Sequence, residues 1–260
     1  MTRRAGVPGV RGLRRALIYL AGAALMLAAV PASSATVGVA VAANFTEAAE
    51  EIAAAFTRET GHEVRLSFGP TGALYAQITQ GAPFAVLLAA DDIRPARAIE
   101  EGFGVQGMSF AYAIGRLALY SASMDVSDGA AILAAGGFSH LAIADPETAP
   151  YGAAAIATLE ALGHAEQIAP RLVIGQSVAQ ALQFVKSGNA EIGMVAASQV
   201  LDEPSAHVWS VPQDLHAPIR QDAVLLRSAE DDEAARSFLA FLRSERARKI
   251  IESYGYDVPD

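Results

Sequence analysis

Four turns in this sequence have the residue types of an anion-binding site. Each follows a run of small or β-branched residues and leads into a helical pattern. They contain Asn44, Thr71 (segment 67–72), Tyr151 (segment 145–152) and Val178 (segment 175–178). The first N–H groups of a helix have no acceptor within the helix, so a helix that starts after a strand favours an anion there. Taken singly, each turn could equally be an ordinary helix start, but their repetition indicates a site.

Local residue types predict how these helices begin. Asn44 is a favourable N-cap and has Glu47 three positions later, close to the spacing of a capping box. Thr71 can cap its helix and offer a hydroxyl, Pro150 suits the first position of a helix, and Ser177 is the expected N-cap before Val178.

The turns offer neutral hydrogen-bond donors only. None has Lys or Arg at its tip, and the acids Asp145 and Glu147 lie upstream in the third turn. Such a site suits an oxyanion that carries no proton. Hydrogen phosphate would leave its O–H without an acceptor, at a cost of about 1–3 kcal/mol. Sulfate, molybdate and tungstate carry no proton at neutral pH and avoid this cost.

Strand and helix patterns alternate through most of the chain, which predicts an α/β fold of largely parallel sheets flanked by helices. Two long strands are expected at 112–121 and 220–227. They divide the sequence into an inner and two outer blocks and predict two lobes hinged by two crossing strands. Residues 36–117 and 219–260 form lobe I, and residues 118–218 form lobe II. Closing the lobes would bring the four turns to one point.

The first 35 residues have the pattern of a secretory signal peptide. Residues 1–16 contain five arginines and no acid, an apolar segment follows, and the small residues PASSA end at Ala35, the expected cleavage site. An uncleaved membrane anchor is the alternative, although the apolar run is short for a membrane span. The pattern predicts export, with a periplasmic location.

Composition excludes several classes of protein. The chain has 19 Lys and Arg, 28 Asp and Glu, and no cysteine. Removing the five leader arginines leaves a net charge of about −14, which argues against nucleic acid or anionic lipid as a partner. The absence of cysteine excludes disulfides and attachment of a lipid to a processed cysteine.

Enzyme signatures are absent from the sequence. The five histidines have no metal-ligand spacing such as H-E-x-x-H, no G-x-S-x-G pattern occurs, and no G-x-G-x-x-G or Walker pattern follows a predicted strand. We expect no catalytic residue, no cofactor and no bare metal ion. Hydrolysis remains an alternative that chromogenic esters and phosphates would test.

Four segments resemble the periplasmic molybdate-binding proteins of ABC transporters. They are VAVAANFTEA (39–48), SFGPTGALYAQITQGAPFAVLLAAD (67–91), LAIADPETAPYGAAA (141–155) and SFLAFLRSERARKIIESYGY (237–256). The resemblance implies a type II periplasmic-binding-protein fold, in which each lobe is a mixed sheet flanked by helices and the oxyanion is buried between the lobes. It also implies delivery of the ligand to a membrane permease, and we expect a monomer.

The same resemblance implies the ligand contacts, which fall on Ala43, Asn44, Thr71, Tyr151 and Val178. Asn44 and Thr71 would donate from side chain and backbone, whereas Tyr151 and Val178 would donate from the backbone. Molybdate and tungstate are nearly the same size, so both are expected ligands.

This chain also departs from the family pattern. Many members have serine at the positions of Asn44 and Thr71, and some present a tyrosine hydroxyl where this chain has Ala196. The methyl group of Ala196 cannot replace that donor. Binding of another anion, such as sulfate or an organic anion, is therefore the alternative function.

Overall fold

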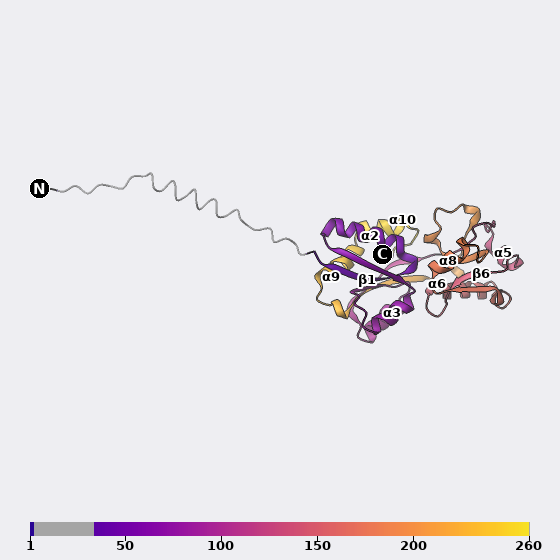
Figure 1. Ribbon diagram of the computed structural model, residues 1–260, viewed down its shortest axis with the longest axis horizontal. Coiled ribbons are helices and arrows are strands. Elements are labelled where there is room, and N and C mark those ends of the chain that lie inside the picture. The colour runs from indigo at the N-terminus through magenta and orange to yellow at the C-terminus, as the bar shows by residue number, and fades with distance from the viewer. Residues whose placement is uncertain (3–33, 260) are drawn as a thin grey trace. The chain divides into compact units, whose positions relative to one another are not determined.

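Strands from both ends of the described chain form the first sheet. The computed structural model describes residues 1–2 and 34–259, and Ser34–Asp260 form one compact unit (Figure 1). Sheet I has the strand order β2-β1-β3-β10-β4. Its strands are β1 (Thr36–Ala42), β2 (Glu63–Gly69), β3 (Val86–Leu88), β4 (Gly104–Gly115) and β10 (Ile219–Leu226). β1 pairs in parallel with β2 and β3, and β10 is antiparallel to β3 and β4.

The middle of the chain forms the second sheet with the same plan. Sheet II has the order β7-β6-β8-β5-β9. β6 is parallel to β7 and β8, and β5 is antiparallel to β8 and β9. The strands are β5 (Leu117–Tyr120), β6 (Leu141–Ala144), β7 (Leu172–Gly175), β8 (Ile192–Ala196) and β9 (Val208–Ser210). The predicted α/β fold with two mixed sheets is confirmed.

The chain passes between the sheets twice. The strand predicted at 112–121 is wrong as a single element, because β4 ends at Gly115 in sheet I and β5 begins at Leu117 in sheet II. Residues 211–218 lead back from β9 to β10. Here lobe I means the elements that carry sheet I, and lobe II means those that carry sheet II. The domain limits 36–117 with 219–260 and 118–218 stay a prediction.

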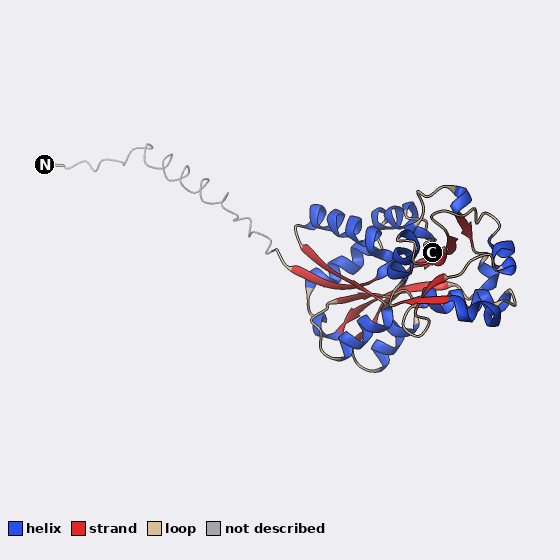
Figure 2. Ribbon diagram, turned by 45° about the vertical axis from the view of Figure 1, so that its right-hand side comes forward, coloured by secondary structure: helices blue, strands red, loops and turns tan. Residues whose placement is uncertain are grey.

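Helices cover both faces of sheet I, as the period of two along its strands requires. Val37, Val39 and Val41 pack with α2, α9 and α10, whereas Ala40 packs on the opposite face with α3. Figure 1 labels these four helices on lobe I, and Figure 2 shows helices in blue on both sides of the red strands. The bounds are α2 (Thr46–Thr60), α3 (Thr71–Thr79), α4 (Ile93–Glu100), α9 (Glu233–Leu242) and α10 (Glu245–Ser253).

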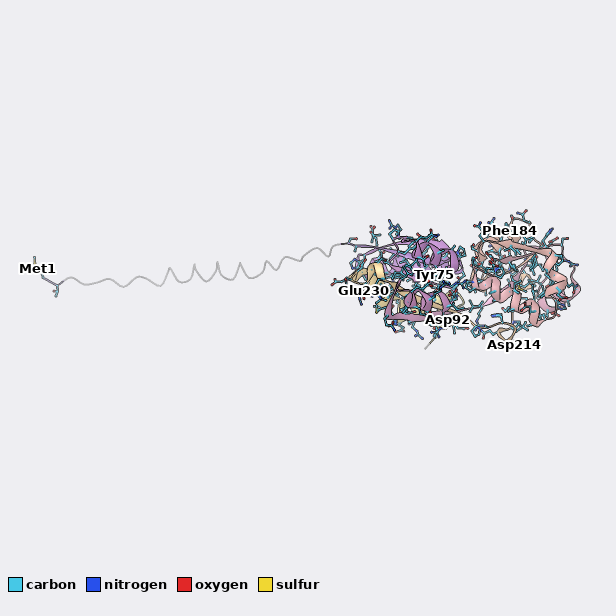
Figure 3. All side chains as sticks on the ribbon, turned by 90° about the horizontal axis from the view of Figure 1, so that it is seen from below. Met1, Tyr75, Asp92, Phe184, Asp214 and Glu230 are labelled. Carbon is cyan, nitrogen blue, oxygen red and sulfur yellow. The ribbon has the colours of Figure 1, made fainter. Side chains whose placement is uncertain are left out.

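Lobe II has its own apolar core, in which Leu119, Ile143 and Met194 are fully buried. Its helices are α5 (Gly129–Ala135), α6 (Pro150–Ala161), α7 (Ala165–Ile168) and α8 (Val178–Lys186). Short 3-10 turns complete the chain: η2 (Ala43–Phe45), η3 (Ala169–Arg171), η4 (Ala197–Gln199), η5 (Ser205–His207), η6 (Gln213–Leu215) and η7 (Arg227–Ala229). Figure 3 places Phe184 and Asp214 on this lobe, and Tyr75 and Asp92 on lobe I.

The predicted signal peptide, residues 1–35, lies almost wholly outside the described residues. In the part that is described, no helix has both the length and the apolar character needed to cross a membrane.

Close packing of α6 on sheet II predicts that Gly152 cannot be replaced. A Cβ at Gly152 would lie 2.2 Å from the Ala144 carbonyl oxygen, which is backbone and cannot move aside. We expect Gly152→Ala to lower the free energy of unfolding by about 1–3 kcal/mol or more, measured by urea denaturation. Gly137→Ala is the control, because nothing lies within 4 Å of its Cβ. Equal stability of the two variants would contradict this packing.

Candidate functional site

The four predicted turns leave the carboxyl ends of neighbouring parallel strands. Ala42 at the end of β1 is in register with Gly69 at the end of β2. In sheet II, Ala144 of β6 is in register with Gly175 of β7. Two turns therefore emerge side by side from each sheet, which is where open α/β sheets bind ligands.

Backbone N–H groups at the start of three helices are buried and unpaired. Thr71 and Val178 are the first residues of α3 and α8, and Tyr151 follows Pro150 at the start of α6. These residues are only 1%, 4% and 2% exposed, respectively. Within residues 34–259, none of the three N–H groups has a backbone acceptor. Buried N–H groups are rarely left unpaired, so this arrangement favours an external acceptor.

The second and third turns meet across the two lobes. The Gly72 N–H donates to the Thr148 carbonyl at 2.9 Å, and Arg94 Nη2 donates to the neighbouring Glu147 carbonyl at 2.9 Å. A Cβ at Gly72 would lie 3.1 Å from Thr148 backbone atoms, so glycine permits this close approach. The contacts use carbonyls of the third turn, and its N–H at Tyr151 stays free.

Asp145 fixes the third turn in this shape. Its Oδ1 accepts the N–H of Glu147 at 3.0 Å, and its Oδ2 accepts the hydroxyl of Thr148 at 2.9 Å. These side-chain bonds add to the backbone bond from the Ala149 N–H to the Asp145 carbonyl, at 2.9 Å.

The first turn lines a cavity at the start of α8. Ala43 and Asn44 of this turn and Ala179 of α8 line a cavity of about 220 Å³, together with residues of α2, of η4 and of the segment that follows α10. Ala43 and Asn44 are 8% and 5% exposed. Thr71, Tyr151 and Val178 do not line this cavity. The packing of α8 against η2 connects the turns of the two lobes.

The predicted helix caps are partly wrong. Asn44 and Thr71 form no side-chain cap: Asn44 lies inside the turn η2, and Thr71 follows Pro70 as the first residue of α3. The Thr71 Oγ1 instead accepts the Ala90 N–H at 3.0 Å, which leaves its hydroxyl hydrogen available. Ser177 is confirmed as the N-cap of α8, and Pro150 as an opening residue of α6.

The Asn44 side chain faces into the protein. Its Nδ2 donates to Gln221 Oε1 at 2.9 Å and to the Tyr256 hydroxyl at 3.1 Å. Both amide hydrogens are therefore occupied. In this arrangement the side chain of Asn44 is no ligand donor, contrary to what the resemblance implied, and its backbone N–H is the donor that remains.

The turn after β8 contacts the first turn through Ser198. Ala196 is fully buried, and Ser198 of the same turn contacts lobe I. The Ser198 hydroxyl donates to the Asn44 carbonyl at 3.3 Å and lies 2.9 Å from the Tyr256 hydroxyl. Tyr256 also donates to the Asn44 carbonyl, at 2.7 Å. These bonds fix the Asn44 carbonyl, and with it the position of the first turn.

Two tyrosines bond the side chain of Gln221, and the sequence analysis did not predict that they lie together. Tyr112 on β4 donates to Gln221 Oε1 at 3.1 Å, and Tyr151 accepts from Gln221 Nε2 at 3.4 Å. Burial raises the pKa of Tyr112, Tyr151 and Tyr256 above the ordinary value, so all three hydroxyls stay protonated and neutral at pH 7.

The sequence analysis also did not predict a role for Arg94 or Asp91 near the site. Arg94 Nη1 binds Asp91 Oδ2 at 2.9 Å while Nη2 reaches Glu147 in lobe II. Burial raises the pKa of Asp91, and the hydrogen bonds and charge of Arg94 oppose that rise. The guanidinium is thus already paired with a carboxylate and a carbonyl. The role of Arg94 depends on its contact with Glu147 in the other lobe. A contact between residues so far apart in the sequence leaves no local pattern that could predict it.

Comparisons with known proteins support a single family. A family model described as bacterial extracellular solute-binding protein matches residues 37–257. The chain is 52% identical over 235 residues to the molybdate-binding protein ModA of Rhodobacter capsulatus, covering 90% of this chain and 93% of that protein. It is 49% identical over 244 residues to ModA of Azotobacter vinelandii, covering 92% and 96%.

A solved structure shares the fold. The Azotobacter vinelandii periplasmic molybdate-binding protein superimposes with a TM-score of 0.83 at 36% identity, over 86% of this chain and 100% of that one.

The contacts of Tyr256 generate a stability prediction. Tyr256→Phe removes the hydroxyl that bonds Asn44 and Ser198 in a buried site, so their polar groups lose a partner. We expect the free energy of unfolding to fall by about 1–3 kcal/mol in urea denaturation. Tyr254→Phe is the matched control, because the Tyr254 hydroxyl makes an exposed bond to Glu51. A loss of equal size in the control would argue against the buried network.

Proposed function

Since this chain belongs to the bacterial extracellular solute-binding protein family, we propose that it binds molybdate, and also tungstate, between its two lobes for an ABC importer. The names of its relatives at 52% and 49% identity support molybdate as the ligand. The role is one of binding and not of catalysis.

One observation carries the proposal. Buried N–H groups of Thr71 in lobe I and of Tyr151 and Val178 in lobe II lack a backbone acceptor within residues 34–259. A tetrahedral dianion supplies acceptors in several directions at once. A hydrogen bond to a charged group contributes about 1.5–3 kcal/mol, and each helix N-terminus adds a smaller favourable dipole term.

We assign the ligand contacts to Ala43, Asn44, Thr71, Tyr151 and Val178. All would donate from the backbone, and Thr71 would add its hydroxyl. The neutral donor set favours an oxyanion without a proton, because a protonated oxygen would face another donor. The only nearby arginine described above, Arg94, is held by Asp91 and Glu147.

The proposed setting follows the family. The protein would act as a monomer in the periplasm and pass its ligand to the permease of an ABC transporter. A sequence pattern typical of a secretory leader supports this location.

The test is titration calorimetry of the mature protein with four sodium salts. Molybdate and tungstate should bind with a Kd below about 1 μM, equivalent to more than about 8 kcal/mol. Phosphate should give no binding heat at neutral pH. Heat from sulfate with none from molybdate would replace the proposal with the alternative anion.

Thr71 provides a prediction for a single residue. Thr71→Ala should weaken molybdate binding by about 1–2 kcal/mol, because a hydroxyl donor to a charged acceptor is lost. Thr71→Ser keeps the hydroxyl and should bind within about twofold of the wild-type chain.

Thr79→Ala serves as the control in the same helix. Its hydroxyl bonds the Ala76 carbonyl in an exposed position, so molybdate affinity should not change. Unchanged affinity in Thr71→Ala as well would remove Thr71 from the binding site.

A further inference from the structure

Buried polar side chains connect the binding turns to the strands that pass between the lobes. We call this set the crossing cluster; it consists of Asn44, Tyr112, Tyr151, Ser198, Gln221 and Tyr256. Each member is at most 8% exposed, and Gln221 is fully buried. A buried polar network of this kind is costly unless its members are all paired.

Gln221 bonds residues of both lobes from a strand beside the crossing, as Tyr256 does from the end of the chain through Asn44 and Ser198. Its Oε1 accepts from Asn44 Nδ2 at 2.9 Å, in the first turn of lobe I. Its Nε2 donates to the Tyr151 hydroxyl at 3.4 Å, at the start of α6 in lobe II. The amide therefore spans two of the proposed ligand-binding turns.

The backbone around Gln221 makes room for this contact. The pairing of β10 with β4 shifts register between Gln221 and Asp222, and such irregularities re-aim side chains. Gly115, the last residue of β4, pairs with Ile219, two residues before Gln221. A Cβ there would be 2.1 Å from the Tyr151 hydroxyl oxygen and 2.6 Å from Gln221 Nε2. Glycine at this position is required for Tyr151 and Gln221 to approach each other.

We propose that Gln221 is a positioning residue that couples lobe closure to the placement of the two binding turns. This inference rests on the proposed oxyanion function. When lobe II moves away, Tyr151 leaves Gln221 Nε2 and a buried donor loses its partner, which favours the closed arrangement. In that arrangement the same amide holds Asn44, so that the backbone N–H groups of both turns face one ligand.

The amide also suits a site for a dianion. Its oxygen faces the donors of Asn44 and Tyr112, and its nitrogen faces the Tyr151 oxygen, so both ends of the amide have a partner without a formal charge. A carboxylate at position 221 could accept from Asn44 and Tyr112 but could not donate to the Tyr151 oxygen, and it would add a buried negative charge near the ligand.

The experiment compares Gln221→Met with the wild-type chain. Methionine is similar in size but forms no comparable hydrogen bonds. Glu50→Cys and Glu160→Cys place one dye on each lobe at exposed positions, and the chain has no native cysteine to interfere. Molybdate titration gives affinity, and energy transfer between the dyes gives closure.

We expect Gln221→Met to weaken molybdate binding at least about tenfold, equivalent to about 1.4 kcal/mol, and to leave more molecules open at saturating ligand. Thr158→Val is the matched control, because its buried hydroxyl bonds only the Ala154 carbonyl within α6. It should lose stability but keep closure, with affinity within about twofold.

Wild-type affinity and closure in Gln221→Met would overturn the inference, as would an equal loss of affinity in Thr158→Val. Should Gln221→Met fail to fold, Tyr151→Phe removes the lobe II partner and should show the same direction of change in both readouts. If the wild-type chain binds neither molybdate nor tungstate, the proposed function fails. Closure of the ligand-free proteins then still decides the role of Gln221, since the variant should be more open.

Discussion

Unpaired backbone donors that are buried where two sheets meet are the constraint on which this structure depends. An N–H group hidden from water without an acceptor costs as much as a lost hydrogen bond, so a fold keeps several of them only when something else supplies the acceptor. Thr71, Tyr151 and Val178 are held in this state by parallel strands that end side by side in each sheet. The fold repeats one device in both lobes: a buried strand, a tight turn and a helix whose first N–H groups face inward.

The contacts around the turns divide the work between donors and acceptors. Carbonyls of the third turn bind Gly72 and Arg94 of lobe I, and the Asn44 carbonyl of the first turn binds Ser198 and Tyr256. The first and third turns thus contribute acceptors to these contacts, whereas Gly72 of the second turn donates its N–H to Thr148 of lobe II. Within residues 34–259 the N–H groups of Thr71, Tyr151 and Val178 have no backbone acceptor, so the contacts between the lobes leave them available to a ligand.

Sequence patterns predicted the strands and helix starts because these depend on local rules. Ser177 caps α8 and Pro150 opens α6, as their residue types indicate. The side chain of Asn44 was misjudged, since an amide that suits an N-cap is drawn inward by Gln221, which is 177 positions away in sequence. The strand expected at 112–121 failed for a related reason. Its apolar pattern is continuous, but the chain changes sheet at Arg116, and that change is set by tertiary packing.

The negative net charge of the chain explains why an anion must be held by hydrogen-bond donors at the site itself. Residues 36–260 carry 14 Lys and Arg (19 less the five in residues 1–16) against 28 Asp and Glu, a net charge of −14, so their overall field opposes an approaching dianion. Salt would screen that field beyond about 10 Å, whereas dipoles and N–H groups at the site act over hydrogen-bonding distances. The buried side chains next to the binding turns are also uncharged. Tyr112, Tyr151 and Tyr256 are neutral at pH 7, as ordinary tyrosines are, and burial raises the pKa of each further. Gln221 supplies an amide where a carboxylate would repel the ligand. Neutral polar groups therefore carry the network, so under the proposed function selectivity for a proton-free oxyanion would arise from the direction of the donors and not from attraction by a cation.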